Sequence, residues 1–308
     1  MIAIPLALAS LSAFAAPFAY VPNEKSGSIS IIDTATDQVI GEIAAGKRPR
    51  GIAADAAGQR LFVTDAGSNG MLVLDTVQRR VIQRKTLGES PEGLSISQDG
   101  TRLAVAVEES NSVALIDTQN GASLGDIRVR GKNPEHAVFS PDGRWLYVSA
   151  EDAKQIDVID VAQRKQVANI PVGMRPRGIG FLPDGSRAYV ACELVDTVYA
   201  IDVASRRVIA EIKAGHFSNG IAVAPDGKRV YVSNGKDGTV TVIDSVKNAV
   251  VATIEVGKRP WNMALTPDGK KLYVANGRSN SVSVIDTEAL RKLTDIAVGE
   301  LPWGVVIR

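Results

Sequence analysis

The chain has 308 residues, of which 45% are hydrophobic and 22% are charged. Its 35 lysines and arginines balance 34 aspartates and glutamates, so no excess of charge favours nucleic acid or an anionic membrane as a partner. One cysteine excludes an internal disulfide, and two histidines are too few for a zinc or copper site built mainly from imidazole.

The N-terminal segment is a predicted export signal. Residues 1–15 are apolar and end in the small-x-small sequence Ala13-Phe14-Ala15, which is typical of a signal-peptidase site. The segment is short for a membrane span, and no later segment is apolar enough to form one. We therefore expect a signal peptide over residues 1–15, a single domain over residues 16–308 and a periplasmic or secreted protein. A membrane anchor or an unstructured apolar N-terminus is the alternative.

A repeat organises the rest of the chain. Seven hydrophobic runs end in an aspartate at intervals of 42 or 43 residues: Asp33, Asp75, Asp117, Asp160, Asp202, Asp244 and Asp286. Within one repeat, turn residues and short apolar runs predict four strands, here named A to D, at 177–182, 188–192, 197–202 and 208–212. A period of roughly 40–50 residues built only from short strands is typical of a propeller, in which each repeat is one blade.

The two ends of the chain predict how the ring closes. The first repeat opens in a B strand at Ala19–Pro22, and the last ends in an A strand at Trp303–Arg308. We predict an all-β, seven-bladed propeller of four-stranded antiparallel blades, whose first blade combines N-terminal strands B, C and D with the C-terminal strand A. This pairing removes open sheet edges, and we expect a monomer.

The repeats resemble a known family. The runs Tyr231-Val232-Ser233-Asn234 and Tyr273-Val274-Ala275-Asn276, each followed by Val-Ile-Asp and a Gly-x-x-Pro loop, are similar to YVTN-type repeats. The segments 23–25, 46–51 and 302–306 resemble propellers associated with PQQ-dependent catabolism, which in turn resemble haem-biosynthesis propellers of denitrifying bacteria. The resemblance implies an exported protein near quinoprotein dehydrogenases.

The loops between D and A strands differ most from repeat to repeat. The residue after the loop proline, or after Ser218 in one copy, is Arg50, Glu92, Glu135, Arg177, Asn219, Trp261 or Trp303. These residues begin the innermost strands, so we expect them to ring the mouth of the central channel as a binding surface. The alternative is a solvated rim whose variation is drift.

Aromatic and basic residues of this face indicate the ligand. Trp261 and Trp303 are predicted to stack on a flat molecule, with packing between blades as the alternative. Guanidinium groups that suit carboxylates share the face: Arg48, Arg50, Arg175, Arg177 and Arg259. A flat polycarboxylate such as PQQ, or another anionic aromatic cofactor, would use both features.

The next position is glycine in five repeats, with His136 and Asn262 as the exceptions. Beside Glu135, His136 is a candidate general base or ligand of a lyase or lactonase. The alternative is a histidine hydrogen-bonded to Glu135.

Loops between B and C strands on the same face are acidic at 108–109, 151–152 and 193. They could hold Ca²⁺, but they lack EF-hand spacing, so we expect a solvated acidic rim and no metal site. Cys192 is a candidate thiolate near Arg175 and Arg177, with an inert, half-buried cysteine as the alternative.

Taken together, these patterns predict an exported propeller that binds a small anionic or aromatic cofactor-like ligand, or a partner protein, at the channel mouth. A role accessory to quinoprotein metabolism follows from the resemblance. The rival hypotheses are an enzyme that uses His136 with Glu135 or a bound cation, and a scaffold for protein interactions without a small ligand.

Overall fold

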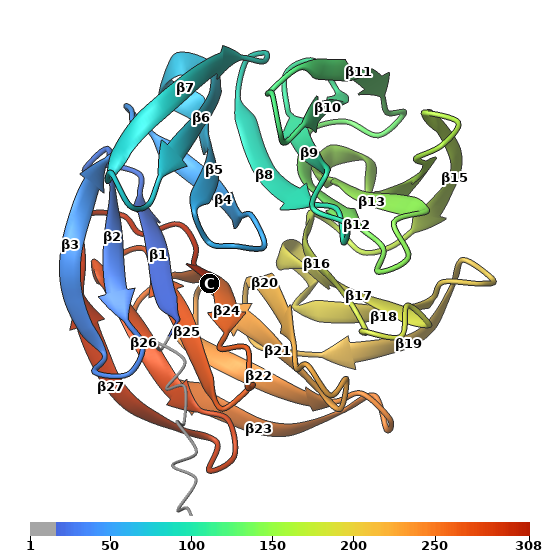
Figure 1. The fold of residues 1–308 in the computed structure, drawn as a ribbon. Coiled ribbons are helices and arrows are strands. Elements are labelled where there is room, and N and C mark those ends of the chain that lie inside the picture. Colours follow the sequence, from blue (N-terminus) through green and yellow to red (C-terminus); the bar gives the residue numbers. More distant parts are fainter. Residues whose placement is uncertain (1–16) are drawn as a thin grey trace, which may run out of the picture.

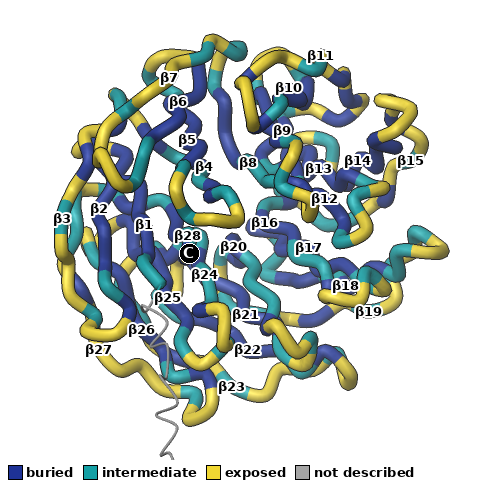
Figure 2. The backbone as a smooth tube through the Cα atoms, in the orientation of Figure 1, coloured by how far each residue is buried: buried dark blue, intermediate teal, exposed yellow. Residues whose placement is uncertain are grey.

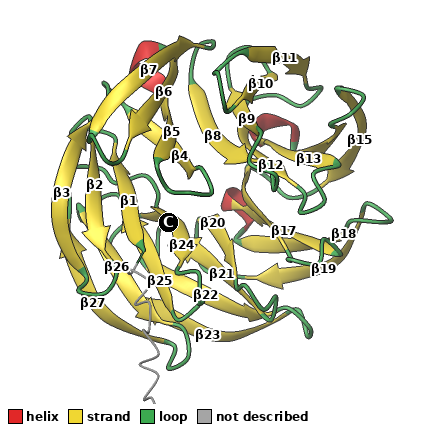
Figure 3. Ribbon diagram, viewed as in Figure 1, coloured by secondary structure: helices red, strands yellow, loops and turns green. Residues whose placement is uncertain are grey.

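The computed structural model describes residues 17–308, so the signal peptide predicted at residues 1–15 lies outside the described part. Seven four-stranded antiparallel sheets surround a central channel like the blades of a propeller (Figure 1). This confirms the predicted all-β, seven-bladed fold. Apart from three short 3-10 helices, the regular structure of residues 17–308 is entirely strand (Figure 3).

The A strands lie nearest the channel and the D strands at the outer rim (Figure 1). The A strands are β4 (Pro49–Ala54), β8 (Pro91–Ile96), β12 (Pro134–Phe139), β16 (Pro176–Phe181), β20 (Ser218–Val223), β24 (Pro260–Leu265) and β28 (Val306–Ile307). The B strands are β1 (Phe18–Asn23), β5 (Arg60–Asp65), β9 (Arg102–Val107), β13 (Trp145–Ala150), β17 (Arg187–Cys192), β21 (Arg229–Asn234) and β25 (Lys271–Asn276).

The C strands are β2 (Ser28–Asp33), β6 (Gly70–Asp75), β10 (Ser112–Asp117), β14 (Gln155–Asp160), β18 (Thr197–Asp202), β22 (Thr239–Asp244) and β26 (Ser281–Asp286). The D strands are β3 (Gln38–Ala44), β7 (Arg80–Thr86), β11 (Ser123–Arg128), β15 (Lys165–Pro171), β19 (Arg207–Lys213), β23 (Ala249–Glu255) and β27 (Arg291–Ala297). The 3-10 helices η1 (Ala66–Ser68), η2 (Glu151–Ala153) and η3 (Glu193–Val195) lie between B and C strands, where only loops were expected.

The ring closes as predicted. The first blade has the strand order β28-β1-β2-β3, so a strand from the C-terminus completes a sheet begun at the N-terminus. Ala19 pairs with Ile307 and Tyr20 with Val306, and an isolated bridge joins Asn23 to Pro302. The described part therefore folds as one closed unit.

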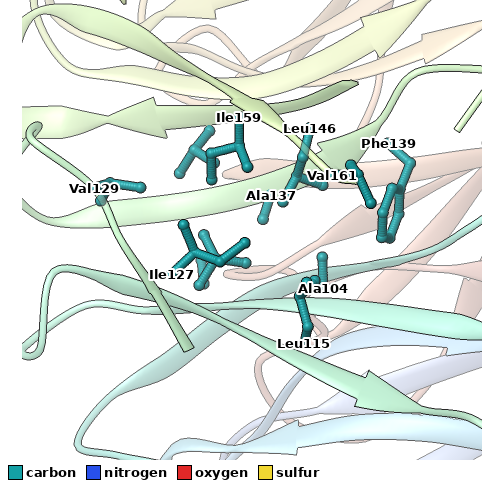
Figure 4. Close-up of a cluster of buried hydrophobic side chains, with 12 residues drawn as sticks. Ala104, Leu115, Ile127, Val129, Ala137, Phe139, Leu146, Ile159 and Val161 are labelled. Atoms are coloured by element: carbon teal, nitrogen blue, oxygen red, sulfur yellow. The ribbon is translucent and has the colours of Figure 1, made fainter. Parts of the chain in front are cut away.

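The core lies between neighbouring blades. In the cluster of Figure 4, Ala104 and Leu115 of one blade pack against Ala137, Leu146 and Ile159 of the next. Each sheet is covered on both faces, which is why the inner strands are nearly all apolar in sequence. Burial is greatest in the B and C strands, less complete in the A strands beside the channel, and lowest in the D strands at the rim (Figure 2).

The seven aspartates that mark the repeat have a structural role. Each ends a C strand, and its carboxylate accepts a hydrogen bond of 2.6–2.9 Å from a backbone N–H two or three residues later. Such short-range bonds stabilise the C–D turn, which explains the regular spacing without any catalytic function. No helix among residues 17–308 is both long and apolar enough to cross a membrane.

Candidate functional site

A cavity of about 420 Å³ opens at the mouth of the channel, on the face of the D–A and B–C loops. It brings together eight of the ten residues predicted for the site: Arg50, Glu135, Arg175, Arg177, Arg259, Trp261, Asn262 and Trp303. Arg48 and His136 are not among its lining residues. Glu92 and Asn219, which were also expected at the mouth, line the cavity as well, together with Glu108 and Glu151 of the acidic loops. Glu24 and Leu301 line the cavity without having been predicted.

A repeated β-bulge positions the ring of mouth residues. In β4, Pro49 pairs with Asp65 but Ile52 pairs with Val63, so Arg50 and Gly51 lie opposite a single residue. The same shift occurs in β8, β12, β16, β20 and β24. A bulge redirects side chains locally, and bulges are frequent beside functional sites. Six A strands therefore each present one side chain at the mouth.

The arginines of the mouth are bound to glutamates. Nη2 of Arg50 lies 3.1 Å from Glu24, and its other terminal nitrogen pairs with Glu92. Arg48, although outside the lining, contacts the same Glu24 carboxylate at 2.6 Å. Arg50 also has a buried Nε atom without a hydrogen-bond partner. One side of the mouth is thus a network of charged groups rather than a set of free cations.

Arg177 is the centre of the second half of this network. Its side chain is only 12% exposed and forms ion pairs with Glu135 at 2.6 Å, with Glu193 at 3.0 Å and with Glu151. Glu193, which is almost fully buried, also binds Arg259 at 2.8 Å. Planar guanidinium groups suit such multiple carboxylate contacts.

The expectation of a solvated acidic rim holds for Glu109 and Asp152, which are exposed, but it is wrong for Glu151 and Glu193. Glu24, Glu151 and Glu193 are 7%, 7% and 1% exposed. Each of these glutamates directly follows the last residue of a B strand, as Glu108 does, while the equivalent position in the other blades is alanine or glycine. The glutamate series is therefore visible when the repeats are aligned at this position. It includes Glu24, which does not belong to an acidic cluster in the sequence.

Burial changes the proton affinity of two mouth carboxyls. Desolvation, reinforced by the nearby Glu135, raises the pKa of Glu92 to about 8 and that of Glu151 to about 7. Burial is the largest influence on the pKa of Glu135 and acts to raise it, but attraction by Arg177, His136 and Arg50 together outweighs burial and lowers the pKa. Close carboxyls with divergent pKa values are typical of functional sites.

Trp261 and Trp303 both line the cavity. The Trp261 ring passes over Gly277, where a Cβ atom would lie 2.4 Å from the ring. Trp303 stacks on His136, with ring centroids 5.6 Å apart and planes at 20°. The predicted indoles therefore do line the mouth, although Trp303 already has one aromatic neighbour.

His136 does not line the cavity, and the alternative of a histidine hydrogen-bonded to Glu135 is wrong. It is half-buried against Trp303, while the adjacent Glu135 carboxylate binds Arg177, and no hydrogen bond joins it to Glu135. Its Nδ1 atom is buried without a partner, and burial lowers the pKa of the imidazole. At neutral pH the ring is therefore uncharged.

Cys192 is not a thiolate. Although it ends β17 close to the mouth loops, its side chain is fully buried in an apolar cluster. Desolvation raises the pKa of the thiol to about 12. The residue occupies a position filled in other blades by asparagines that bond neighbouring strands, such as Asn234. Within residues 17–308, no group of three His, Cys, Asp or Glu side chains is arranged to hold a metal ion.

Two family models match parts of the chain. Residues 161–300 match the model described as lactonase, 7-bladed beta-propeller, and residues 98–193 match that of the cytochrome D1 heme domain. Each match spans fewer than half of the residues. No curated protein matches the chain in sequence.

Solved structures share the fold. Hydrazine synthase from Kuenenia stuttgartiensis is 26% identical with a TM-score of 0.81, over 87% of this chain and 92% of that one. A putative 6-phosphogluconolactonase from Bacteroides fragilis is 21% identical with a TM-score of 0.79, over 96% and 99%. Dihydro-heme d1 dehydrogenase NirN in complex with DHE is 16% identical with a TM-score of 0.70, over 97% and 77%. The chain is thus a seven-bladed propeller similar to lactonase-type and heme d1-type propellers.

Proposed function

We propose that the protein binds a planar, anionic aromatic molecule in the mouth cavity. The observation that carries this proposal is the convergence of two indoles and four arginines on one cavity of about 420 Å³. Binding sites for small molecules typically have volumes of roughly 300–1,000 Å³ and combine apolar walls with a few polar groups. Dispersed indoles and arginines would have favoured a scaffold without a small ligand.

The charge of the mouth is compatible with an anion. Four arginines and five glutamates line the cavity, so the lining has one net negative charge when every group is ionised. Because the pKa values of Glu92 and Glu151 are raised to about 8 and about 7, Glu92 is mostly protonated and Glu151 is about half protonated near neutral pH. Protonation of Glu92 alone makes the lining neutral, and protonation of both carboxyls gives it one net positive charge. An acidic ligand would face the arginines while its ring lies against Trp261 and Trp303.

The comparisons support a ligand of this class without identifying it. The partial match to a cytochrome D1 heme domain and the similarity to a heme d1 dehydrogenase favour a tetrapyrrole. The resemblance to propellers of PQQ-dependent catabolism favours PQQ, which would make the protein an accessory of quinoprotein metabolism. The predicted export and monomeric state are compatible with either ligand. The proposal also includes a partner protein that binds at the same face.

Titration calorimetry with PQQ and with haemin tests the proposal. We expect one of them to bind, and Trp261→Leu to weaken binding about tenfold, because aromatic stacking contributes about 0.5–1.5 kcal/mol. Trp145→Leu is the matched control, since Trp145 lies outside the lining, between Arg144 and Arg206. Failure of both compounds, or an equal loss in the control, would argue against the site.

A second candidate function is lactone hydrolysis, favoured by the partial lactonase match and by the protonated carboxyl of Glu92. In this alternative Glu92 is a better proton donor than the predicted His136, which does not line the cavity. Glu92→Gln should then lower turnover by roughly 10²–10⁴-fold, the usual range for general acid catalysis. His136→Ala should retain more activity. A wild-type protein inert towards sugar lactones would eliminate this function.

A further inference from the structure

A second depression lies beside the mouth, on the same face. It is a groove of about 510 Å³ between the blade of β20–β23 and the blade of β24–β27. Lys236, Lys258 and Arg278 line it together with Phe217. Arg259 lines both the groove and the mouth cavity, so the two spaces meet at one guanidinium group.

The cations of this groove differ from those of the mouth. None of the ion pairs formed among residues 17–308 includes Lys236, Lys258 or Arg278. Asp237 supplies the one carboxylate among the lining residues, and it accepts a hydrogen bond of 2.7 Å from the backbone N–H of His216. The groove therefore has a clear excess of positive charge.

The repeat explains this excess. Blades that carry a glutamate after the B strand place a carboxylate beside the loop arginines, as Glu193 does for Arg259. At the two blades that form the groove, the equivalent residues are Gly235 and Gly277. The side chain that would neutralise the cations is thus missing where the lysines and Arg278 gather.

Backbone contacts hold the groove in shape. The N–H of Arg278 donates to the carbonyl of Lys258 at 3.0 Å, and the N–H of Lys258 donates to Ser279 Oγ at 2.7 Å. The guanidinium of Arg259 and the ammonium of Lys236 lie 5.4 and 5.6 Å from the centre of the Phe217 ring. Contacts of this type orient a cation without neutralising it.

We propose that this groove is an anion-binding subsite that receives a carboxylate or phosphate group carried by the molecule in the mouth cavity. The inference rests on the proposed function and narrows the ligand to a planar compound with an acidic arm. The arm would cross Arg259 and end between Lys258 and Arg278. Charge-assisted contacts to carboxylate or phosphate oxygens are among the stronger hydrogen bonds in proteins.

Inorganic phosphate tests the subsite independently of the mouth ligand. Titration at low ionic strength, followed by amide chemical shifts, should show binding that the double variant Lys258→Gln/Arg278→Gln weakens at least about tenfold. Lys228→Gln/Lys270→Gln removes two cations from the A–B turns on the opposite face and should leave binding unchanged. Absence of phosphate binding, or the same loss in both double variants, overturns the proposal.

A matched pair of probes tests the connection to the mouth. Pyrene-1-butanoate and pyrene-1-butanol share a planar ring and differ in the acidic arm, and quenching of tryptophan emission reports their binding. We expect the acid to bind about tenfold more tightly than the alcohol, and Lys258→Gln/Arg278→Gln to abolish this preference. An unchanged preference in that variant contradicts the connection. If neither probe binds, the aromatic wall proposed for the mouth fails, while the phosphate titration still decides the subsite.

Discussion

Replacing Arg177 with glutamine should destabilise the fold more than any other single change at the mouth. The substitution removes the charge that compensates Glu135, Glu151 and Glu193, all of them buried. Glutamine keeps an unbranched polar side chain and removes the charge, but it is shorter than arginine, so part of the loss comes from packing. The same substitution at Arg175 removes the same atoms and serves as the reference for the electrostatic contribution of the network.

The magnitude follows from the burial of the partners. Removing one member of a buried ion pair costs about 3–5 kcal/mol, because a charge is left without compensation in a medium of low polarity. For a domain of this size each kcal/mol lowers the Tm by about 2–4 °C, so we expect a decrease of roughly 10 °C. Arg175→Gln is the control. Arg175 contacts Glu151 and Glu193 at 3.2 and 3.4 Å, but its side chain is 42% exposed, so the substitution should lower the free energy of unfolding by at most about 1 kcal/mol.

Urea unfolding followed by far-UV circular dichroism at pH 8 and pH 5 is the assay. Without Arg177, the burial of Glu135 is less well offset, so the pKa of this carboxyl in the folded protein should rise above the ordinary value of about 4.3. Stability gained from its protonation is fully present below that value and is lost as the pH rises through the folded pKa. The deficit of the variant should therefore be smaller at pH 5 than at pH 8. A loss below 1 kcal/mol at pH 8, or an equal loss at both pH values, would refute the reasoning.

Three further predictions concern the ring, the thiol and the aromatic wall. Deleting residues 301–308 removes β28 and exposes the edge of β1, so cooperative unfolding should disappear from thermal melts; a truncated protein that melts like the parent would contradict this closure. Cys192 should react with Ellman's reagent only at the rate of global unfolding, since it is fully buried and its pKa is raised to about 12; rapid labelling of the native protein would contradict its burial. Gly277→Ala should displace the Trp261 ring and weaken ligand binding, because the new Cβ would lie 2.4 Å from it, and unaltered tryptophan emission would show that the ring had not moved.

The repeat made the architecture readable from sequence because each blade uses the same local chemistry. Short apolar runs between turn residues predicted the strands, and in the A–B turns Gly143 and Gly185 have positive φ angles of 67° and 71°. Strand bounds shifted by about one residue, as at β16, where the observed strand begins at Pro176 rather than at Arg177. The first and last residues of a strand depend on which residues of the neighbouring strand pair with it, and the sequence of one strand does not specify this.

The mouth was predictable only in part. Variation among repeats identified Arg50, Arg177, Trp261 and Trp303, and the structure places all four around one cavity. Variation among the repeats could not show that the arginines would be bound to glutamates, because the partner glutamates come from loops 16 to 66 residues away in sequence. Nor could it show that His136 would stack on Trp303, because that contact joins residues from distant parts of the ring.

The sequence by itself determined the number of blades, the order of strands, the closure of the ring and the face on which the repeats diverge. These properties follow from local patterns that recur every 42 or 43 residues, so each copy reinforces the next. Tertiary structure alone decided which charges are buried and which remain free. Ring closure brings the B–C loop glutamates Glu24, Glu151 and Glu193 against D–A loop arginines, and it leaves Lys236, Lys258 and Arg278 of the neighbouring groove without such partners. The free energy of a charge depends on its neighbours in space rather than along the chain.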